Sequence, residues 1–494
     1  MTLSQFTTDS PVDVLIVGAG LAGIGAACWL QKECPGKQYV ILEARDTLGG
    51  TWDLFRYPGI RSDSDMYTLG YAFKPWLADK AIADGETIRS YIEETAREND
   101  VVRHIQFGHK VVAASWSSAD ACWTVDIERV TTGTRQRVYA RFLYMCSGYY
   151  SYTQPHRPTF TGEVDFAGTV VLPQLWPDGL DYSGKRIVVV GSGATAMTLV
   201  PAMAKSAAHV TMLQRSPTYV VALPSQDKVS QTLRRWLPKG AAYRLTRWKN
   251  TLLRVVMYWL TRSRPELAKR QLLKDVIKQL GPGYDVQKHF TPRYNPWDQR
   301  ICVVPDGDLF AVIKAGRASV VTDEIERFTT DGLLLKSGQT LPADVIVLAT
   351  GLTVQLFGGM QLTVDGKAYQ PDELMAYKGM MFGDVPNLAM AFGYTNASWT
   401  LKTDLTARYV CRLLRYMDKH NHTIAVPRRE GDVTPQPFLD FTSGYVQRAG
   451  GNLPKQGSRR PWQVHQNYLR DSMIIRYSRL VDGVLRFGSK GVLP

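Results

Sequence analysis

The sequence is poor in cysteine. Only six of its 494 residues are cysteines, and none lies in a C-x-x-C pair or another spacing typical of metal ligands. A disulfide scaffold and a metal site are therefore not expected, and a reduced, cytoplasmic setting fits best. The start of the sequence, MTLSQFTTDSPVD, lacks the features of a secretory signal, and no run of roughly 18 apolar residues could span a bilayer. These absences argue against secretion and transmembrane insertion.

Acidic residues are scarce in one segment. The chain has 59 Lys and Arg against 45 Asp and Glu, and the stretch from Arg234 to Lys274 alone carries twelve cations and one acid, Glu266. Since the rest is nearly balanced, we expect no nucleic-acid partner. Aromatic residues interleave with these cations and leave two interpretations open: helices that roof an active site with solvated cations, or a peripheral membrane contact through residues 234–274. The aromatic residues are Trp236, Tyr243, Trp248, Tyr258 and Trp259.

Residues 12–45 contain an apolar run, a glycine-rich turn, an alanine-rich stretch and a second apolar run. This order predicts a strand, a helix and a strand, with Gly18, Gly20 and Gly23 in the spacing that lets backbone amides bind a pyrophosphate. Glu43 ends the second run, 25 residues after Gly18, where its carboxylate can accept hydrogen bonds from both ribose hydroxyls. Residues 12–45 therefore predict a dinucleotide-binding unit.

Residues 186–215 repeat this pattern with Gly191, Gly193 and Ala196 in the turn. The position that matches Glu43 is Gln214, and a cation, Arg215, follows it. An acid there would repel a ribose 2′-phosphate, whereas a guanidinium can bind it through paired hydrogen bonds. The second loop therefore predicts NADPH rather than NADH, with Thr218 as a further candidate for binding it.

The two loops predict an α/β protein with two Rossmann-like dinucleotide-binding domains. Hydride transfer between two cofactors follows, and the natural pair is FAD on the first loop and NADPH on the second. Residues 223–298 are helical in period and strongly basic, so we expect them to be an insertion in the second domain. The expected boundaries are 1–148 with 358–494 for the FAD domain, 149–222 with 299–357 for the NADPH domain, and 223–298 for the helical insertion.

A third motif, GGTWDLFRYPGIRSD, lies between the loops. It fits the pattern [A/G]-G-x-W-x4-[F/Y]-P-[G/M]-x3-D at every position, from Gly49 to Asp63. On this motif the chain resembles the type I Baeyer–Villiger monooxygenases, within the flavin-containing monooxygenase superfamily. In detail it resembles the mycobacterial prodrug-activating branch of that family, in the stretches GGTWDLFRYPGIRSDSDMYTLG, HFTPRYNPWDQR, MAYKGMM and GYTNASWTLK.

The resemblance implies an FAD-dependent, NADPH-consuming monooxygenase. Members use molecular oxygen to form a C4a-peroxyflavin, which converts small apolar ketones into esters or lactones and oxidises sulfides to sulfoxides. The resemblance assigns catalytic roles to Arg300 and to its acidic partner Asp63. It also places Gly50, Thr51, Trp52 and Asp63 at the flavin, and makes Asn396 and Trp399 weaker candidates near the nicotinamide and substrate. Gln299 stands where many relatives carry a lysine that helps to bind the 2′-phosphate.

One position departs from the family. The fingerprint F-x-G-x3-H-x3-W-[P/D] matches Phe166, Gly168, Trp176 and Pro177, but Leu172 replaces the histidine. Because leucine cannot donate, accept or titrate, any hydrogen-bonded latch at this position is replaced by apolar packing. Two alternatives to Baeyer–Villiger activity stay open: a flavin-containing monooxygenase restricted to N- and S-oxygenation, and a weakly coupled NADPH oxidase.

Overall fold

The larger sheet of the protein is built around the first glycine loop. A computed structural model describes residues 3–429, 431, 433–439 and 441–491. Its nine-stranded sheet runs in the order β18-β17-β4-β5-β6-β1-β2-β3, and β21 pairs with β6. The strands are β1 (Val12–Val17), β2 (Tyr39–Leu42), β3 (Ile105–Gln106), β4 (His109–Ser117), β5 (Cys122–Arg129), β6 (Arg135–Met145), β17 (Gln361–Val364), β18 (Lys367–Tyr369) and β21 (Leu388–Met390).

Helices cover this sheet. The strands β1 and β2 are buried at nearly every position, as expected for parallel strands with both faces covered. The helix α1 packs against α11. The helices of this half are α1 (Leu21–Glu33), α2 (Thr51–Leu54), α3 (Met66–Leu69), α4 (Gly85–Glu98), α11 (Trp399–Lys419), α12 (Gly444–Arg448) and α13 (Tyr468–Tyr477). Short strand pairs complete it: β19 (Ala376–Tyr377) with β20 (Met381–Phe382), β22 (Ile424–Pro427) with β25 (Leu485–Gly488), and β23 (Pro435–Pro437) with β24 (Lys455–Gly457).

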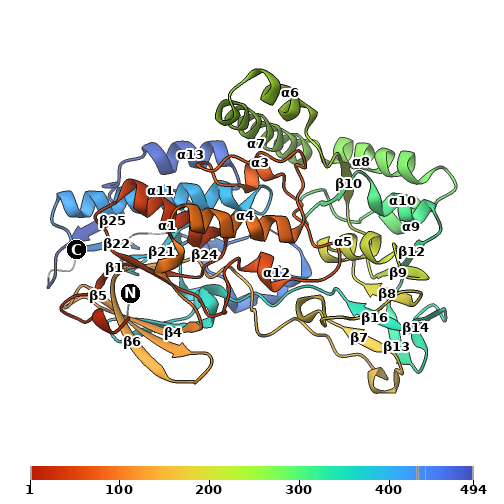
Figure 1. Cartoon of the computed structure of the whole chain (residues 1–494), viewed down its shortest axis with the longest axis horizontal. Helices are drawn as coiled ribbons and strands as arrows, with labels where there is room; N and C mark the ends of the chain where they lie inside the picture. The colour runs from red at the N-terminus through yellow and green to blue at the C-terminus, as the bar shows by residue number, and fades with distance from the viewer. Residues whose placement is uncertain (1–2, 430, 432, 440, 492–494) are drawn as a thin grey trace.

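The second sheet is five-stranded and entirely parallel, in the order β12-β9-β8-β16-β7. It stands beside the first, on the right in Figure 1. Its elements are β7 (Thr169–Val171), β8 (Arg186–Val190), α5 (Ala194–Met203), β9 (His209–Gln214), α10 (Asp308–Lys314), β12 (Ala318–Thr322) and β16 (Val345–Leu348). A separate antiparallel sheet is formed by β13 (Ile325–Thr329), β14 (Gly332–Leu335) and β15 (Thr340–Pro342).

The chain passes between the two sheets along paired segments. It leaves the first sheet after β6 and returns after β16, and the two crossings form a bridge at Tyr150 and Val354. Backbone hydrogen bonds from Ser151 N to Thr353 O (2.8 Å) and from Gln355 N to Tyr149 O (3.0 Å) join them further. The two halves are therefore connected by a two-stranded hinge.

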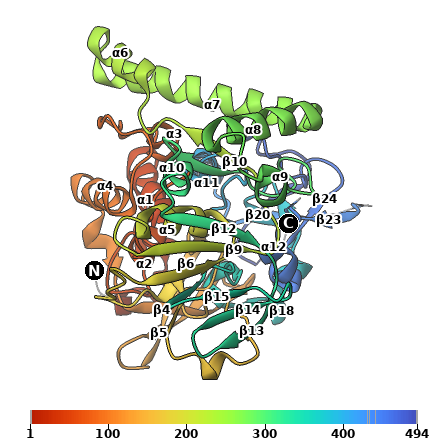
Figure 2. The same ribbon diagram turned by 90° about the vertical axis from the view of Figure 1, so that its right-hand side faces the viewer.

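The basic insertion packs on both halves. It leaves the second half after β10 (Val220–Leu223) and returns through β11 (Cys302–Pro305), which pairs with β10 in parallel. The longest helix, α7, contacts α3 and α13 of the first half, whereas α8 contacts α10 and β10 of the second. Figure 2 shows α7 along the outer edge of the molecule. The helices are α6 (Lys228–Trp236), α7 (Lys239–Ser263), α8 (Pro265–Leu280) and α9 (Val286–Phe290).

A buried arginine fastens α7 to the first half. Arg247 donates to the carbonyl oxygens of Tyr67 (2.8 Å) and Gly70 (2.7 Å). Its second nitrogen lies 3.4 Å from the carboxylate of Asp404 on α11, and both side chains are at most 10% exposed. Asp404 also accepts hydrogen bonds from Trp29 and from the backbone of Ala72. Burial raises the pKa of Asp404, so its charge depends on the neighbouring guanidinium.

We expect Arg247→Leu to lower the free energy of unfolding by about 3–5 kcal/mol, because it leaves a buried carboxylate without its cation. Without Arg247 the pKa of Asp404 rises further. A group whose pKa is higher in the folded state stabilises the fold while it is protonated, and this stabilisation is lost as the pH rises. The loss in free energy of unfolding caused by Arg247→Leu should therefore be smaller at pH 5 than at pH 8. Urea unfolding at both pH values measures this. Arg244→Leu, at an exposed position of the same helix, is the control; equal losses in both variants would contradict the prediction.

A candidate active site between the two halves

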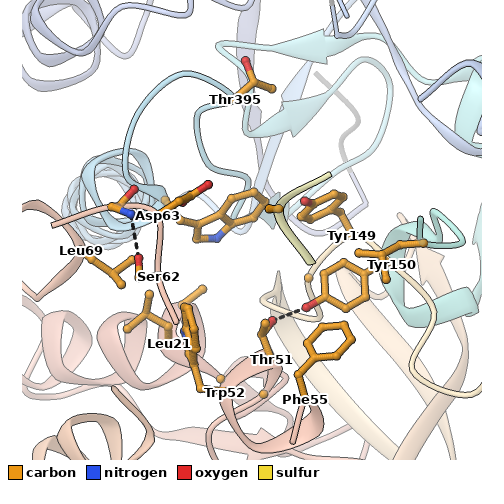
Figure 3. A pocket seen from close by; sticks show the side chains of 18 of the residues that line it. Leu21, Thr51, Trp52, Phe55, Ser62, Asp63, Leu69, Tyr149, Tyr150 and Thr395 are labelled. Carbon is orange, nitrogen blue, oxygen red and sulfur yellow. Dashed lines mark hydrogen bonds between the residues drawn. The ribbon is translucent and has the colours of Figure 1, made fainter. Parts of the chain in front are cut away.

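A cavity of about 310 Å³ opens between the two halves, and part of its wall comes from residues 391–470 of the first half, the C-terminal segment. The hinge supplies one wall, with Tyr149 and Tyr150, and Ser62 and Asp63 lie on the opposite side (Figure 3). Further lining residues come from the first glycine loop, from residues 49–63, from α5 of the second half, from the segment just before β11 and from the C-terminal segment. They include Gly20, Gly50, Thr51, Trp52, Thr195, Arg300, Phe392, Trp399 and Tyr445.

The first glycine loop has the geometry of a dinucleotide site. Gly18 has a φ of +106°, and a Cβ there would lie 2.6 Å from the carbonyl oxygen of Cys146. A Cβ on Gly23 would lie 1.9 Å from the carbonyl oxygen of Gly18, so this glycine allows the helix to approach the strand closely. Gly20 lines the cavity and begins α1 without a side-chain cap. The amides of the first turn of α1 are therefore available to an anion.

Glu43 lies at the end of β2, close to this loop. Its two carboxylate oxygens accept hydrogen bonds from the backbone N–H of Ala19 (2.7 Å) and of Arg45 (2.9 Å). Burial raises its pKa, and these two donors oppose the shift. A carboxylate has about four acceptor positions, so two remain for ribose hydroxyls. Glu43 thus has a second role, fixing the glycine loop, that its sequence position did not reveal.

The segment after Gly49 shapes the floor of the cavity. Gly49 and Gly50 have φ values of +117° and +59°, and a Cβ on Gly50 would lie 3.0 Å from the Cα of Gly20. Thr51 follows and shares a 2.5 Å hydrogen bond with the hydroxyl of Tyr150 in the hinge (Figure 3). Trp52 lines the cavity beside them. The uncapped N-terminus of α1, the glycines that leave room for a ligand close to the backbone, and Glu43 together fit FAD.

The second glycine loop repeats this geometry. Gly191 has a φ of +137°, and a Cβ there would lie 2.3 Å from the carbonyl oxygen of Ala349. Gly193 begins α5 without a side-chain cap, and a Cβ on it would meet nothing within 4 Å. Ala196 is fully buried and packs between helix and sheet, so it does not itself face a ligand. Among the described residues, Thr350 Oγ1 beside this loop is buried without a hydrogen-bond partner.

Arg215 and its neighbours complete this loop. Arg215 is exposed, whereas the amide of Gln214 points inward and donates to His289 O (2.7 Å) and Thr322 Oγ1 (2.9 Å). Thr218 shares a 3.0 Å hydrogen bond with Ser192 of the loop. A second cation, Arg448 of α12, comes from far along the chain and donates to Thr350 O (3.4 Å). Burial and the nearby charge of Arg215 lower the pKa of Arg448.

These features fit NADPH. Two guanidinium groups, an open helix N-terminus and an unpaired hydroxyl surround the loop, and an anionic nucleotide would reduce the repulsion between the two cations. No local pattern in the sequence pointed to Arg448.

Arg300 and Asp63 form an ion pair that joins the two halves. Arg300 comes just before β11, and its Nη2 lies 3.0 and 2.9 Å from the two carboxylate oxygens of Asp63. The side chains are 40% and 25% exposed, and both line the cavity. The charge of Asp63 raises the pKa of Arg300. The guanidinium therefore stays charged and fixed beside the space where a substrate can react.

Aromatic rings make up much of the cavity wall. Tyr149 stacks on Trp399, with ring centroids 5.1 Å apart, and Phe392 packs against both. Tyr149 and Tyr150 were not among the site residues predicted from the sequence. The run YYSY directly after Cys146-Ser147-Gly148 is the sequence signal that indicates them. Asn396, the other weak candidate, lines a neighbouring cavity instead.

The linker that carries Leu172 is held by a different residue. Leu172 is half-buried and packs against the apolar cluster that contains Phe166. Two residues later, the buried Gln174 donates from Nε2 to the carbonyl oxygens of Ser151 (2.8 Å) and Tyr152 (3.1 Å). The linker is therefore tied to the hinge through an amide rather than through position 172.

Two dinucleotide-binding folds that face one cavity, with a fixed arginine between them, define a flavin- and nicotinamide-dependent oxidoreductase. Residues 79–422 match the flavin-binding monooxygenase-like family, and residues 16–75 match the NAD(P)-binding Rossmann-like domain. The chain belongs to this family of flavin-binding monooxygenases.

Similar proteins span the whole chain. The FAD-containing monooxygenase EthA of Mycobacterium tuberculosis is 54% identical over 481 residues, which are 97% of this chain and 98% of that protein. The structure of a steroid monooxygenase bound to NADP has a TM-score of 0.77 at 21% identity, covering 97% of this chain and 100% of the other. The complex of OTEMO with FAD and NADP has a TM-score of 0.69 at 21% identity, covering 84% and 87%.

The protein is thus a member of the flavin-binding monooxygenases, and it shares its fold with the NADP-bound steroid monooxygenase. The predicted α/β fold with Rossmann-like dinucleotide binding is confirmed; the smaller sheet is entirely parallel, whereas the larger one also contains antiparallel pairs. None of the helices in the described part of the chain is long and apolar enough to cross a membrane.

Proposed function

We propose that the protein inserts one oxygen atom into small apolar ketones, giving esters or lactones, and oxidises sulfides to sulfoxides. The ion pair of Arg300 with Asp63 in the central cavity is the observation that carries this proposal. FAD, reduced by NADPH, supplies the electrons that activate molecular oxygen. The residues of this chain bind the two cofactors, orient the substrate and exclude water.

Arg300 stabilises negative charge at the reacting oxygen. When a nucleophile adds to a ketone, the carbonyl oxygen gains charge, and a planar donor already fixed beside it needs no reorganisation. Asp63 holds the guanidinium through both carboxylate oxygens. The wall of Tyr149, Phe392 and Trp399 keeps the surroundings apolar, which strengthens this interaction.

The cofactor-binding roles follow the two loops. FAD would contact Gly18, Gly20, Gly23, Glu43, Gly50, Thr51, Trp52 and Asp63, and NADPH would contact Gly191, Gly193, Arg215 and Thr218. Ala196, proposed from its place in the glycine motif, would shape the second loop from its buried position without touching the nucleotide. Arg448 adds a second cation for NADPH. We propose residues 1–148 and 358–494 as the FAD domain, 149–222 and 299–357 as the NADPH domain, and 223–298 as the insertion.

The two alternative activities, N- and S-oxygenation and NADPH oxidation without a substrate, do not need Arg300 to stabilise a carbonyl adduct. Oxygenation at nitrogen or sulfur creates no adduct with negative charge on a carbonyl oxygen, and an NADPH oxidase needs no substrate site at all. A partly exposed ion pair that lines a cavity with aromatic walls favours ketone oxygenation over both.

We expect Arg300→Met to lower the rate of ketone oxygenation at least about 100-fold, because it removes a fixed charge from the reacting oxygen. Thioether oxidation should fall much less. Product formation from a cyclic ketone and a thioether, measured beside NADPH consumption, checks this. The control Arg137→Met breaks an exposed pair with Asp126 (2.8 Å). Unchanged ketone oxygenation in Arg300→Met would refute the proposed role.

We expect Arg215→Gln to raise the KM for NADPH about tenfold, because hydrogen bonds between charged groups contribute about 1.5–3 kcal/mol. The KM for NADH, which lacks the 2′-phosphate, should stay within a factor of two. Arg327→Gln, at an exposed position of the same half, is the control. Equal effects on both nucleotides would show that Arg215 does not recognise the 2′-phosphate.

The insertion supports a second proposal, peripheral contact with a membrane. One face of α7 exposes apolar side chains, each between 40% and 63% exposed, among the cations of the insertion. They are Leu245, Trp248, Leu252, Leu253, Val256, Met257, Trp259 and Leu260. An apolar face bordered by cations suits an anionic lipid surface, whereas the same charge on a second copy would repel it.

The protein should therefore sediment with vesicles of phosphatidylglycerol and phosphatidylcholine at low salt, and less at high salt. The double variant Leu252→Glu with Leu253→Glu should lower this partitioning at least about tenfold, since it removes two apolar side chains and adds repulsion. Val164→Glu, at a residue that is 96% exposed elsewhere, should change nothing. Binding that does not depend on salt or on α7 would contradict the proposal.

A further inference from the structure

A second cavity of about 400 Å³ lies between α7 and the C-terminal segment. Thr395, Ala397 and Phe441 line both this cavity and the central one. The two cavities are therefore neighbours, and these shared residues form the partition between them. Figure 3 shows Thr395 at the far side of the central cavity from Thr51 and Phe55.

The partition is fixed by side-chain hydrogen bonds. Gln466 accepts from the backbone N–H of Thr395 (3.0 Å) and from its hydroxyl (3.1 Å), and Asn396 donates to Gln466 O (2.8 Å). These bonds hold the backbone of residues 395–397 in place. Because Asn396 is held by Gln466, it lines the second cavity and not the central one.

Much of the second cavity is apolar. Its aromatic lining residues come from α7 and from the C-terminal segment: Tyr258, Trp259, Phe438, Phe441 and Tyr468. Val255 and Val464 add to this surface. Such a lining suits an aliphatic or aromatic chain that continues from a group in the central cavity.

The charged lining residues are all cations. Three arginines line the cavity, Arg254, Arg262 and Arg470, and no acidic residue does. Arg254 pairs with Asp65 (3.2 Å) and Arg262 with Asp298 (2.7 Å). No ion pair of Arg470 occurs among the described residues, so its guanidinium can take a new anionic partner.

Two further features favour an anion near Arg470. It belongs to the first turn of α13, whose cap Asn467 also lines the cavity, so the positive end of the helix dipole faces the same region. Burial and the charge of Arg470 lower the pKa of His465 to about 4. At neutral pH the histidine is uncharged and can offer a hydrogen bond rather than a competing charge.

We propose that the second cavity binds the carboxylate end of an elongated substrate. The ketone or sulfide of that substrate lies beside Arg300, its apolar chain runs along Thr395, Ala397 and Phe441, which line both cavities, and its carboxylate pairs with Arg470. This inference rests on the proposed function of the central cavity. It names the substrate class as apolar keto acids or thioether acids with a chain long enough to reach from one cavity to the other.

A matched pair of substrates tests the reaction. A ten-carbon keto acid with the ketone far from the carboxylate is compared with its methyl ester, using kcat/KM of the holoenzyme. The wild type should prefer the acid about tenfold, because the ester cannot form the charged hydrogen bond to Arg470. Arg470→Gln should remove this preference through KM and leave the ester within a factor of two. The control is Arg135→Gln, at an exposed position of β6.

Direct binding separates the site from the reaction. Decanoate, which has no group to oxygenate, should bind the holoenzyme in equilibrium dialysis and bind Arg470→Gln about tenfold more weakly. If neither keto acid nor ester is oxygenated but this difference persists, the anion site stands and the proposed ketone activity fails. A second outcome would refute the anion site and leave the proposed function standing. In it, acid and ester are oxygenated with equal kcat/KM, and Arg470→Gln changes neither the kcat/KM for the acid nor the affinity for decanoate.

Discussion

The ion pair between Arg300 and Asp63 joins two segments that are 237 residues apart. Asp63 belongs to the segment that follows the first glycine loop, and Arg300 to the return from the insertion into the second half. Nearby, Arg61 pairs with Asp308 of α10 and makes a second tie between the same halves. The central cavity exists because these ties and the hinge hold two dinucleotide folds with their glycine loops facing each other.

Close backbone contacts impose a second constraint. At Gly18 and Gly191 the chain turns with positive φ against a carbonyl oxygen from the neighbouring strand end. A side chain at either position would push apart the strands that carry the cavity. The same strand ends continue into the hinge, so the geometry of both cofactor loops and the aromatic wall depends on one set of backbone contacts.

The basic insertion combines structural and surface roles. Some of its cations are used inside the protein: Arg247 binds carbonyl oxygens and Asp404, Arg254 pairs with Asp65, and Lys249 pairs with Asp227. Its apolar stripe on α7 faces outward. The segment therefore lines the second cavity and presents a different chemistry outside. A count of charges along the sequence could not separate these two groups, because pairing depends on partners that are distant in sequence.

The sequence by itself determined the two glycine loops, the acid after β2 and the cation after β9, because these features act through local spacing along one strand–turn–helix unit. It also identified Arg300 and Asp63 through a resemblance, and the structure brings them together. Only the tertiary structure placed Gln174 rather than residue 172 at the hinge, Arg448 beside the second loop, and Asn396 in a second cavity. Each of these depends on segments far apart in the chain, whose contacts are decided by how helices and sheets pack and not by any local pattern.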